Sequence, residues 1–166
     1  MKADDHATLV ETLLTTCRDR GLRAATAESC TGGLVAAAIT EVAGASDVFE
    51  RGFVVYSNAA KVQLLGAAES TLRAHGAVSR ETAVELAQGA LAHSEADIAV
   101  SVTGVAGPGG GTAQKPVGLV HFACARRSGG VLSAERRFGA LTRAEIRALA
   151  TRQALEMLLE AARLAP

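Results

Sequence analysis

The chain has 166 residues, with 17 acidic and 17 basic side chains, and 49% of it is hydrophobic. This length and composition predict one globular domain over residues 1–166 and exclude a disordered chain. The zero net charge and the 3% of aromatic residues argue against a nucleic-acid binder, which needs a basic face or aromatic stacking platforms.

Cysteine and histidine usage gives no sign of a disulfide framework or a metal site. The three cysteines are odd in number and lack a C-x-x-C spacing, and the four histidines form no H-x-x-x-H pair. Residues 1–5 lack the apolar core of a signal peptide, and no apolar run reaches the length of a membrane span. We therefore expect a cytoplasmic protein without a metal, a cofactor or membrane contact.

Helical and extended patterns alternate along the first half of the chain. The expected elements are, in order, a helix over 5–20 ended by Gly21, a strand over 22–28, a helix over 32–43, a strand over 49–56, a short helix capped by Asn58, and a polar, alanine-rich connector to Gly76.

The second half adds a hairpin to the same alternation. It predicts a helix over 80–93 capped by Ser79, a buried strand over 97–102, a glycine-rich loop over 104–116, hairpin strands over 117–125 and 131–138, and a helix over 143–163 that opens with a capping box of Thr142 and Glu145. Together these elements predict an α/β domain of three layers, with helices on both faces of a mixed sheet.

The turn between the first strand and the next helix carries a hydroxyl and a thiol side by side. Free N–H groups at a helix start suit either an anion or the oxyanion of an attacked carbonyl. Ser29 is the preferred nucleophile, and Cys30 is a rival because thiolates are activated at helix N-termini. A plain helix cap explains the same turn. The candidate amide donors are those of Cys30, Thr31, Gly32 and Gly33.

Lys61 is the candidate general base. With Asn58 as the cap, Lys61 falls in the first turn of its helix, where the dipole lowers the pKa of an amine and favours a role as base. Tyr56, at the end of the preceding strand, would relay or orient the proton. A surface lysine beside a half-buried tyrosine fits the same spacing, and Ser57 is a weaker alternative nucleophile.

The glycine-rich loop reads TGVAGPGGG over 103–111 and follows a buried strand, where α/β proteins place ligands. It matches neither the dinucleotide fingerprint nor the P-loop. Its glycines, with Gly104, Gly107 and Gly109 as candidate contacts, would let backbone N–H groups approach a phosphate or a ribose. A flexible surface loop is the alternative.

Two arginines lie four residues apart on one face of the last helix. Arg143 sits in the first turn, where positive charge is unfavourable, and with Arg147 it would clamp a phosphate or a carboxylate. Solvent-facing arginines fit equally well. The basic pairs at 126–127 and 136–137 are expected to be solvated strand ends rather than a DNA contact.

Taken together, the motifs resemble the C-terminal domain of the competence/damage-inducible protein family CinA, including its stand-alone nicotinamide-nucleotide amidohydrolases. The matching motifs span about 90 residues in family order, counted from the sequence. They are AESCTGG at 27–33, RGFVVYSNAAK at 51–61, HGAVS at 75–79, SVTGVAGPGGG at 101–111 and KPVG at 115–118.

The resemblance implies deamidation of nicotinamide mononucleotide to nicotinate mononucleotide in pyridine nucleotide salvage, with ammonia released and no metal or cofactor used. It matches Ser29 to the family's nucleophile, and Tyr56 and Lys61 to the residues that assist it. Thr103 and the glycine loop match the nucleotide-contacting loop. It also implies a homodimer or a larger homo-oligomer.

One stretch departs from the family pattern. Members usually carry Phe-x-Gly-Asp-Arg before the last helix, whereas residues 138–143 read FGALTR, without the aspartate and with one residue added. This difference concerns the placement of Arg143 more than the nucleophile. Two other functions stay open, a nucleotide-binding regulatory module without catalysis and an amidase for another substrate.

Overall fold

The computed structural model describes residues 6–166. The first five residues lie outside the described part. They include the start of the helix expected over 5–20 and the stretch on which the prediction of no signal peptide rests.

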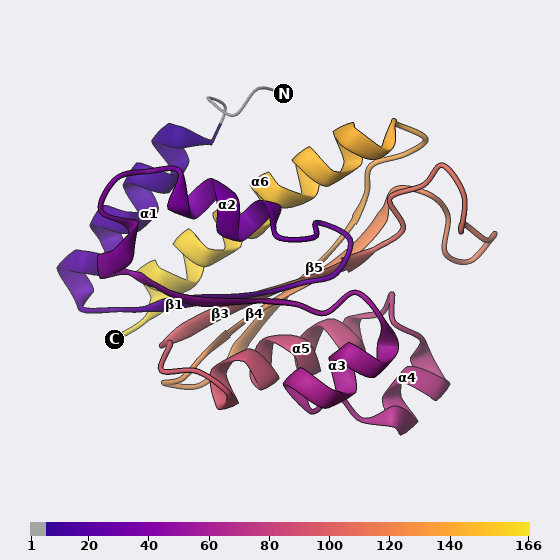
Figure 1. Cartoon of the computed structure of the whole chain (residues 1–166), viewed down its shortest axis with the longest axis horizontal. Helices are drawn as coiled ribbons and strands as arrows, with labels where there is room; N and C mark the ends of the chain where they lie inside the picture. The colour runs from indigo at the N-terminus through magenta and orange to yellow at the C-terminus, as the bar shows by residue number, and fades with distance from the viewer. Residues whose placement is uncertain (1–5) are drawn as a thin grey trace.

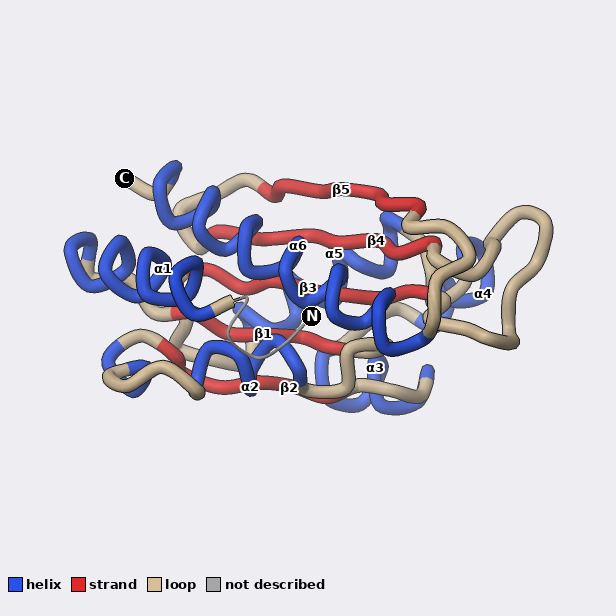
Figure 2. Tube along the Cα trace, turned by 90° about the horizontal axis from the view of Figure 1, so that it is seen from above, coloured by secondary structure: helices blue, strands red, loops and turns tan. Residues whose placement is uncertain are grey.

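The described residues form a five-stranded mixed sheet between two layers of helices, as the sequence predicts (Figure 1). The strand order is β2-β1-β3-β4-β5, so β2 and β5 lie at the two edges (Figure 2). β1 is parallel to both β2 and β3, while β3, β4 and β5 are antiparallel neighbours. The strands are β1 Ala24–Glu28, β2 Phe49–Val54, β3 Ile98–Gly104, β4 Leu119–Arg126 and β5 Val131–Arg137.

Three helices cover each face of the sheet in the described chain (Figure 1). On one face lie α1 Ala7–Arg20, α2 Leu34–Thr40 and α6 Arg143–Leu164. On the other lie α3 Asn58–Leu65, α4 Glu69–His75 and α5 Arg80–Ala92, with α3 and α4 packed against α5. As predicted, Gly21 ends α1 in a left-handed conformation, Ser79 caps α5, and Thr142 and Glu145 form the capping box of α6.

Two predictions about the helices near the site are wrong. The cap of α3 is Ser57, whose side chain accepts the N–H of Ala60 at 3.0 Å, and Asn58 is already helical. The expected connector to Gly76 contains α4. The N-terminus of α4 is stabilised by a residue of another helix, because the Glu85 carboxylate of α5 accepts the N–H of Ala68.

Side chains alternate between the two faces of the central strands, as extended backbone requires. Ala24, with Ile98 and Val100 of β3, belongs to the core beneath α1, α2 and α6. Ala25 and Ala27 pack against the small residues of α5 on the other face. The core beneath α5 is largely alanine, which lets this helix approach the sheet closely.

Parallel strands bring their carboxyl ends to one edge of the sheet. Glu28 pairs with Val54 of β2 and with Val102 of β3, so the residues that follow these three strands start at the same level. This edge is where open α/β sheets hold their ligands.

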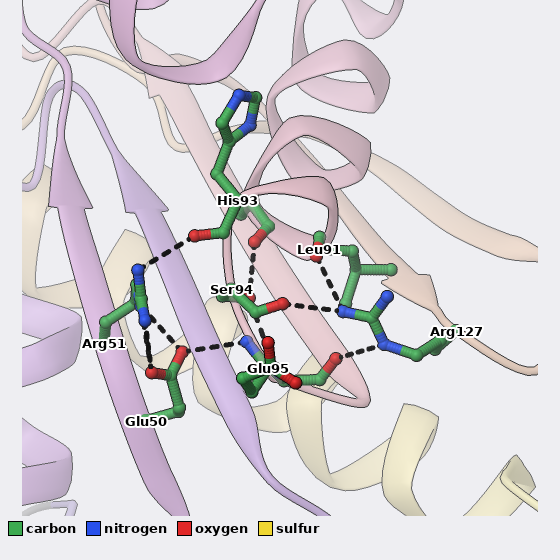
Figure 3. Close-up of polar contacts among 9 residues, drawn as sticks. Glu50, Arg51, Leu91, His93, Ser94, Glu95 and Arg127 are labelled. Atoms are coloured by element: carbon green, nitrogen blue, oxygen red, sulfur yellow. Dashed lines mark hydrogen bonds and ion pairs between the residues drawn. The ribbon is translucent and has the colours of Figure 1, made fainter.

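The end of α5 lies away from this edge and is held by two arginines (Figure 3). Arg127 donates to the carbonyls of Leu91, Ser94 and Ala96, and Arg51 donates to that of His93 at 3.0 Å. Guanidinium groups favour a helix C-terminus, where carbonyls lack partners. Arg127 is therefore a structural cap and not the solvated strand end that its sequence context suggests.

Candidate active site

A cleft of about 210 Å³ opens at the edge where β1, β2 and β3 end. Asn58 and residues 77–78 of the loop before α5 contribute to its wall. The residues singled out from the sequence that line it are Ser29, Cys30, Tyr56, Lys61, Thr103, Gly104 and Arg143. The topology thus brings the turn after β1, helix α3 with Lys61, and the start of the glycine-rich loop to one place.

Ser29 and Lys61 meet inside this cleft. The Nζ atom of Lys61 lies 3.1 Å from Ser29 Oγ, within hydrogen-bond distance. Lys61 is 1% exposed and Ser29 is 8% exposed. Ala25 and Ala27 of β1 face the layer of α3 and α5, and Ser29 continues this alternation on the same side. The N–H of Ser29 donates to Val102 O at 2.9 Å. The candidate nucleophile and the candidate base therefore lie in contact.

The other partners of Lys61 orient its amine. Nζ donates to Val55 O at 2.9 Å and to Tyr56 O at 3.1 Å. A neutral amine has two N–H bonds and one lone pair, so two carbonyl partners leave the lone pair for Ser29. None of the described carboxylates forms an ion pair with Lys61. The geometry suits removal of the hydroxyl proton.

Burial of Lys61 favours the role of base that the sequence suggests for it. Desolvation lowers the pKa of Lys61 from its ordinary value of 10.5, because the charged form loses water, and the nearby Cys30 opposes this shift. The sequence predicts the direction of this shift but attributes it to the helix dipole.

The Cys30 side chain packs into a different layer from Lys61. It belongs to the core beneath α1, α2 and α6, opposite to the face on which Lys61 lies. Burial raises the pKa of the Cys30 thiol to about 11, so it is protonated near neutral pH. This state argues against the thiol as the nucleophile.

Tyr56 contacts Lys61 through its backbone and not through its phenol. The Tyr56 side chain is 63% exposed, and its hydroxyl accepts a hydrogen bond from Arg143 Nη2 at 3.2 Å. The phenol of Tyr56 therefore makes no direct contact with Lys61 or Ser29 to support the predicted proton relay. The Tyr56 carbonyl instead helps to orient the amine.

The start of α2 is already occupied by a carboxylate that the sequence reasoning missed. The buried Glu28 accepts the N–H groups of Val35 at 2.8 Å and Ala36 at 3.0 Å. The N-terminus of α2 is therefore not open to an external anion. The alternation along β1 could have indicated this, because it places Glu28 on the side of α2.

The amides of the turn itself are only partly used. Gly32 N–H donates to Ser29 O at 3.1 Å, which removes it from the expected oxyanion donors. The N–H groups of Cys30, Thr31 and Gly33 have no oxygen acceptor within residues 6–166. Of these three residues Cys30 lines the cleft, so its amide is the candidate for holding an oxyanion.

Arg147 binds the turn and does not line the cleft. Its Nε donates to Cys30 O and its Nη2 to Thr31 O, both at 3.1 Å. The predicted clamp of two arginines is therefore divided, because Arg147 is engaged with protein carbonyls and Arg143 remains at the cleft.

Arg143 stays exposed although it makes two contacts. Its Nη1 donates to Gly107 O at 3.0 Å and its Nη2 to the Tyr56 hydroxyl. It links the glycine-rich loop to the end of β2 and brings a positive charge to the wall of the cleft. The altered stretch before α6 thus still places Arg143 at the site.

Thr103 and the glycines have separate roles in the structure. The buried Thr103 donates its hydroxyl to Ala77 O at 2.8 Å, which ties the loop before α5 to β3. A Cβ on Gly104 would lie 2.7 Å from Val120 Cγ2, so this glycine serves packing. Gly107 has a positive φ of 71°. Gly109 has open space around it and is free to meet a ligand.

No three His, Cys, Asp or Glu side chains of residues 6–166 gather where they could hold a metal ion. None of the helices in this range combines the length and the apolar character needed to cross a membrane.

Comparisons with known proteins identify relatives over most of the chain. The family model of the CinA C-terminal domain matches residues 6–162. Nicotinamide-nucleotide amidohydrolase PncC of Escherichia coli (strain K12) is 52% identical over 139 residues, which are 84% of this chain and 84% of that protein. A CinA-like protein of Akkermansia muciniphila is 47% identical over 160 residues, which are 96% of this chain but 38% of the relative. The chain thus spans less than half the length of some relatives it matches.

A solved structure has the same fold. The crystal structure of competence/damage inducible protein CihA from Agrobacterium tumefaciens superposes with a TM-score of 0.92. It is 54% identical in sequence, and the match covers 93% of each chain.

Proposed function

The chain belongs to the CinA C-terminal domain family, and on this premise we propose that it hydrolyses the carboxamide of nicotinamide mononucleotide to nicotinate mononucleotide and ammonia. The contact between Lys61 Nζ and Ser29 Oγ carries the proposal. Burial lowers the pKa of Lys61 and so favours its neutral form, and a neutral amine activates a serine.

In the first half of the reaction, Ser29 Oγ attacks the carboxamide carbon while its proton passes to Lys61. The carbonyl oxygen becomes an oxyanion, which the Cys30 amide would stabilise. As the C–N bond breaks, Lys61 returns the proton to the leaving nitrogen, and ammonia departs. Ser29 is left as an ester of nicotinate mononucleotide.

In the second half, water replaces the leaving group. Lys61 takes a proton from the attacking water, and the oxyanion forms again at the same amide. Collapse of this intermediate breaks the ester bond and returns the proton to Ser29 Oγ. The products are the nucleotide carboxylate and the free enzyme.

The size of the cleft bears on how the nucleotide would lie. About 210 Å³ is below the roughly 300–1,000 Å³ of pockets that enclose a drug-sized ligand. We expect the carboxamide and its ring inside the cleft and the phosphate at the mouth, beside the exposed Arg143. Arginine suits this position because its guanidinium binds phosphate through two parallel hydrogen bonds.

The direct experiment is to incubate the chain with nicotinamide mononucleotide and to measure ammonia and nicotinate mononucleotide together. Equal amounts of both products support the proposal. A nucleotide-binding module without catalysis predicts a rise in melting temperature with the nucleotide and no ammonia. An amidase for another substrate predicts ammonia from a different carboxamide and none from this one.

A further inference from the structure

Arg147 holds the two carbonyls that follow the nucleophile. The residue lies in the second turn of α6, more than 110 positions from the Ser29 turn, and its guanidinium is half-buried against this turn. Nε and Nη2 each donate one hydrogen bond, at 3.1 Å, to the successive carbonyls of Cys30 and Thr31. The guanidinium thus acts as a two-point clamp on the backbone.

Peptide geometry converts this clamp into a constraint on an amide. In a trans peptide the C=O and the N–H of one unit point in opposite directions. Gly107–Pro108 is the only cis peptide among the described residues, so the unit between Cys30 and Thr31 is trans. Its carbonyl faces Arg147 on α6, and the N–H of Thr31 therefore points away from α6.

The Thr31 amide is one of the unused donors of the turn. No oxygen within residues 6–166 accepts its N–H, although Thr31 is fully buried. The Thr31 amide is enclosed by the protein and does not line the cleft, whereas Cys30 of the same turn does. The peptide that Arg147 holds therefore supports the turn from which Cys30 meets the cleft.

Two backbone hydrogen bonds also hold this turn, because Gly32 N–H donates to Ser29 O and Leu34 N–H donates to Thr31 O, both at 3.1 Å. Gly32 and Gly33 have positive φ angles of 58° and 103°, and glycine moves between such conformations at little cost. The far side of the turn is held separately, because Glu28 binds the amides of Val35 and Ala36. Arg147 is the anchor on the near side.

From these contacts we infer that Arg147 is a positioning residue, which fixes the turn carrying Ser29 and the candidate oxyanion donor at Cys30, and does not bind the substrate phosphate. The inference rests on the proposed function, in which Ser29 attacks the carboxamide. It differs from the sequence-based expectation that Arg147 clamps an anion of the ligand.

A pair of substrates separates the two roles. Nicotinamide riboside has the same carboxamide as nicotinamide mononucleotide but lacks the phosphate. If Arg147 orients the oxyanion donor, Arg147→Ala lowers kcat by about 10- to 100-fold, below the cost of deleting such a donor outright. KM changes little, and kcat/KM falls by the same factor for both substrates. A loss confined to the nucleotide, or a rise in KM alone, overturns the inference.

Three variants complete the design. Arg147→Lys keeps the charge but places one donor group where two were, so it restores kcat only in part. Arg152→Ala removes an arginine of the same helix that pairs with Glu156 at the surface, and it keeps wild-type kinetics. Arg143→Ala is expected to lose more kcat/KM with the nucleotide than with the riboside.

A crystal structure of Arg147→Ala gives a readout that is independent of activity. The inference predicts that the peptide between Cys30 and Thr31 rotates or takes several orientations, while the contacts of Glu28 persist. An unchanged peptide overturns it. If the wild-type chain releases no ammonia, the proposed reaction fails, and this structure still decides whether Arg147 holds the turn.

Discussion

The amine of Lys61 lies 3.1 Å from the hydroxyl of Ser29, although the two residues are 32 positions apart. The contact exists because β1 and β2 run parallel and adjacent, so the residues after both strands emerge at one edge. Backbone carbonyls supply the other two partners of Lys61, and they leave one direction of the amine for the serine.

Replacing the base removes the reaction but keeps the fold. Lys61→Met retains most of the side-chain length and loses the amine, so we expect kcat to fall by about 10²- to 10⁴-fold. Steady-state ammonia release with the proposed substrate measures this, and circular dichroism checks the fold. A well-folded Lys61→Met with wild-type kcat would exclude Lys61 as the base.

The pH dependence of activity follows from the state of Lys61. Burial lowers its pKa below 10.5, and only the neutral amine accepts the serine proton. We therefore expect kcat/KM to rise with pH along a limb whose midpoint lies below 10.5. A profile without such a limb, or one that falls as Lys61 loses its proton, speaks against the assignment.

The same shift makes stability depend on pH. Between the folded pKa of Lys61 and 10.5 the unfolded chain binds more protons than the folded chain, so the free energy of unfolding rises with pH in this window. Below the folded pKa both states are protonated and this contribution stays constant. Denaturant titrations of the wild-type chain and Lys61→Met test this, since the variant lacks the rise.

The thiol next to the nucleophile should be unreactive. Burial raises the pKa of Cys30 to about 11, so the folded chain holds little thiolate at pH 8. Alkylation of Cys30 by iodoacetamide, followed by peptide mass spectrometry, is expected to be much slower in the native chain than in urea. Fast modification of Cys30 in the native chain is the opposite result.

Gly104, at the end of β3, and Gly109, in the glycine-rich loop, form a matched pair. A Cβ on Gly104 would meet Val120 Cγ2 at 2.7 Å and Leu119 O at 2.9 Å, so Gly104→Ala should lower the free energy of unfolding by about 1–3 kcal/mol. Gly109 has nothing within 4 Å, and Gly109→Ala should leave stability unchanged. Urea unfolding measures both, and equal effects would contradict the packing described here.

Much of the fold could be predicted from local patterns. The alternation of strands and helices, the left-handed Gly21 and the caps at Ser79 and Thr142 depend on neighbouring residues, and the sequence contains them. Helix α4 was missed because its first amide is held by Glu85 of another helix. The helix cap is Ser57 and not the predicted Asn58, because serine and asparagine favour the N-cap position about equally and the two residues are adjacent.

The site was predictable in its members but not in their contacts. The sequence identifies Ser29 and Lys61 as candidates, yet only the sheet order places them together. Spacing on α6 groups Arg143 with Arg147, while the structure directs one to the cleft and the other to the turn. The different partners of the two arginines all lie more than 30 positions away in the sequence, so local spacing does not reveal them.

The most direct test of the account compares two alanine variants of adjacent residues. Ammonia release from nicotinamide mononucleotide is measured for the wild-type chain, Ser29→Ala and Cys30→Ala under identical conditions. We expect release by the wild-type chain and by Cys30→Ala, and a loss of at least about 10³-fold in Ser29→Ala, because the Ser29 hydroxyl forms the covalent intermediate. Undiminished release by a folded Ser29→Ala would contradict this expectation.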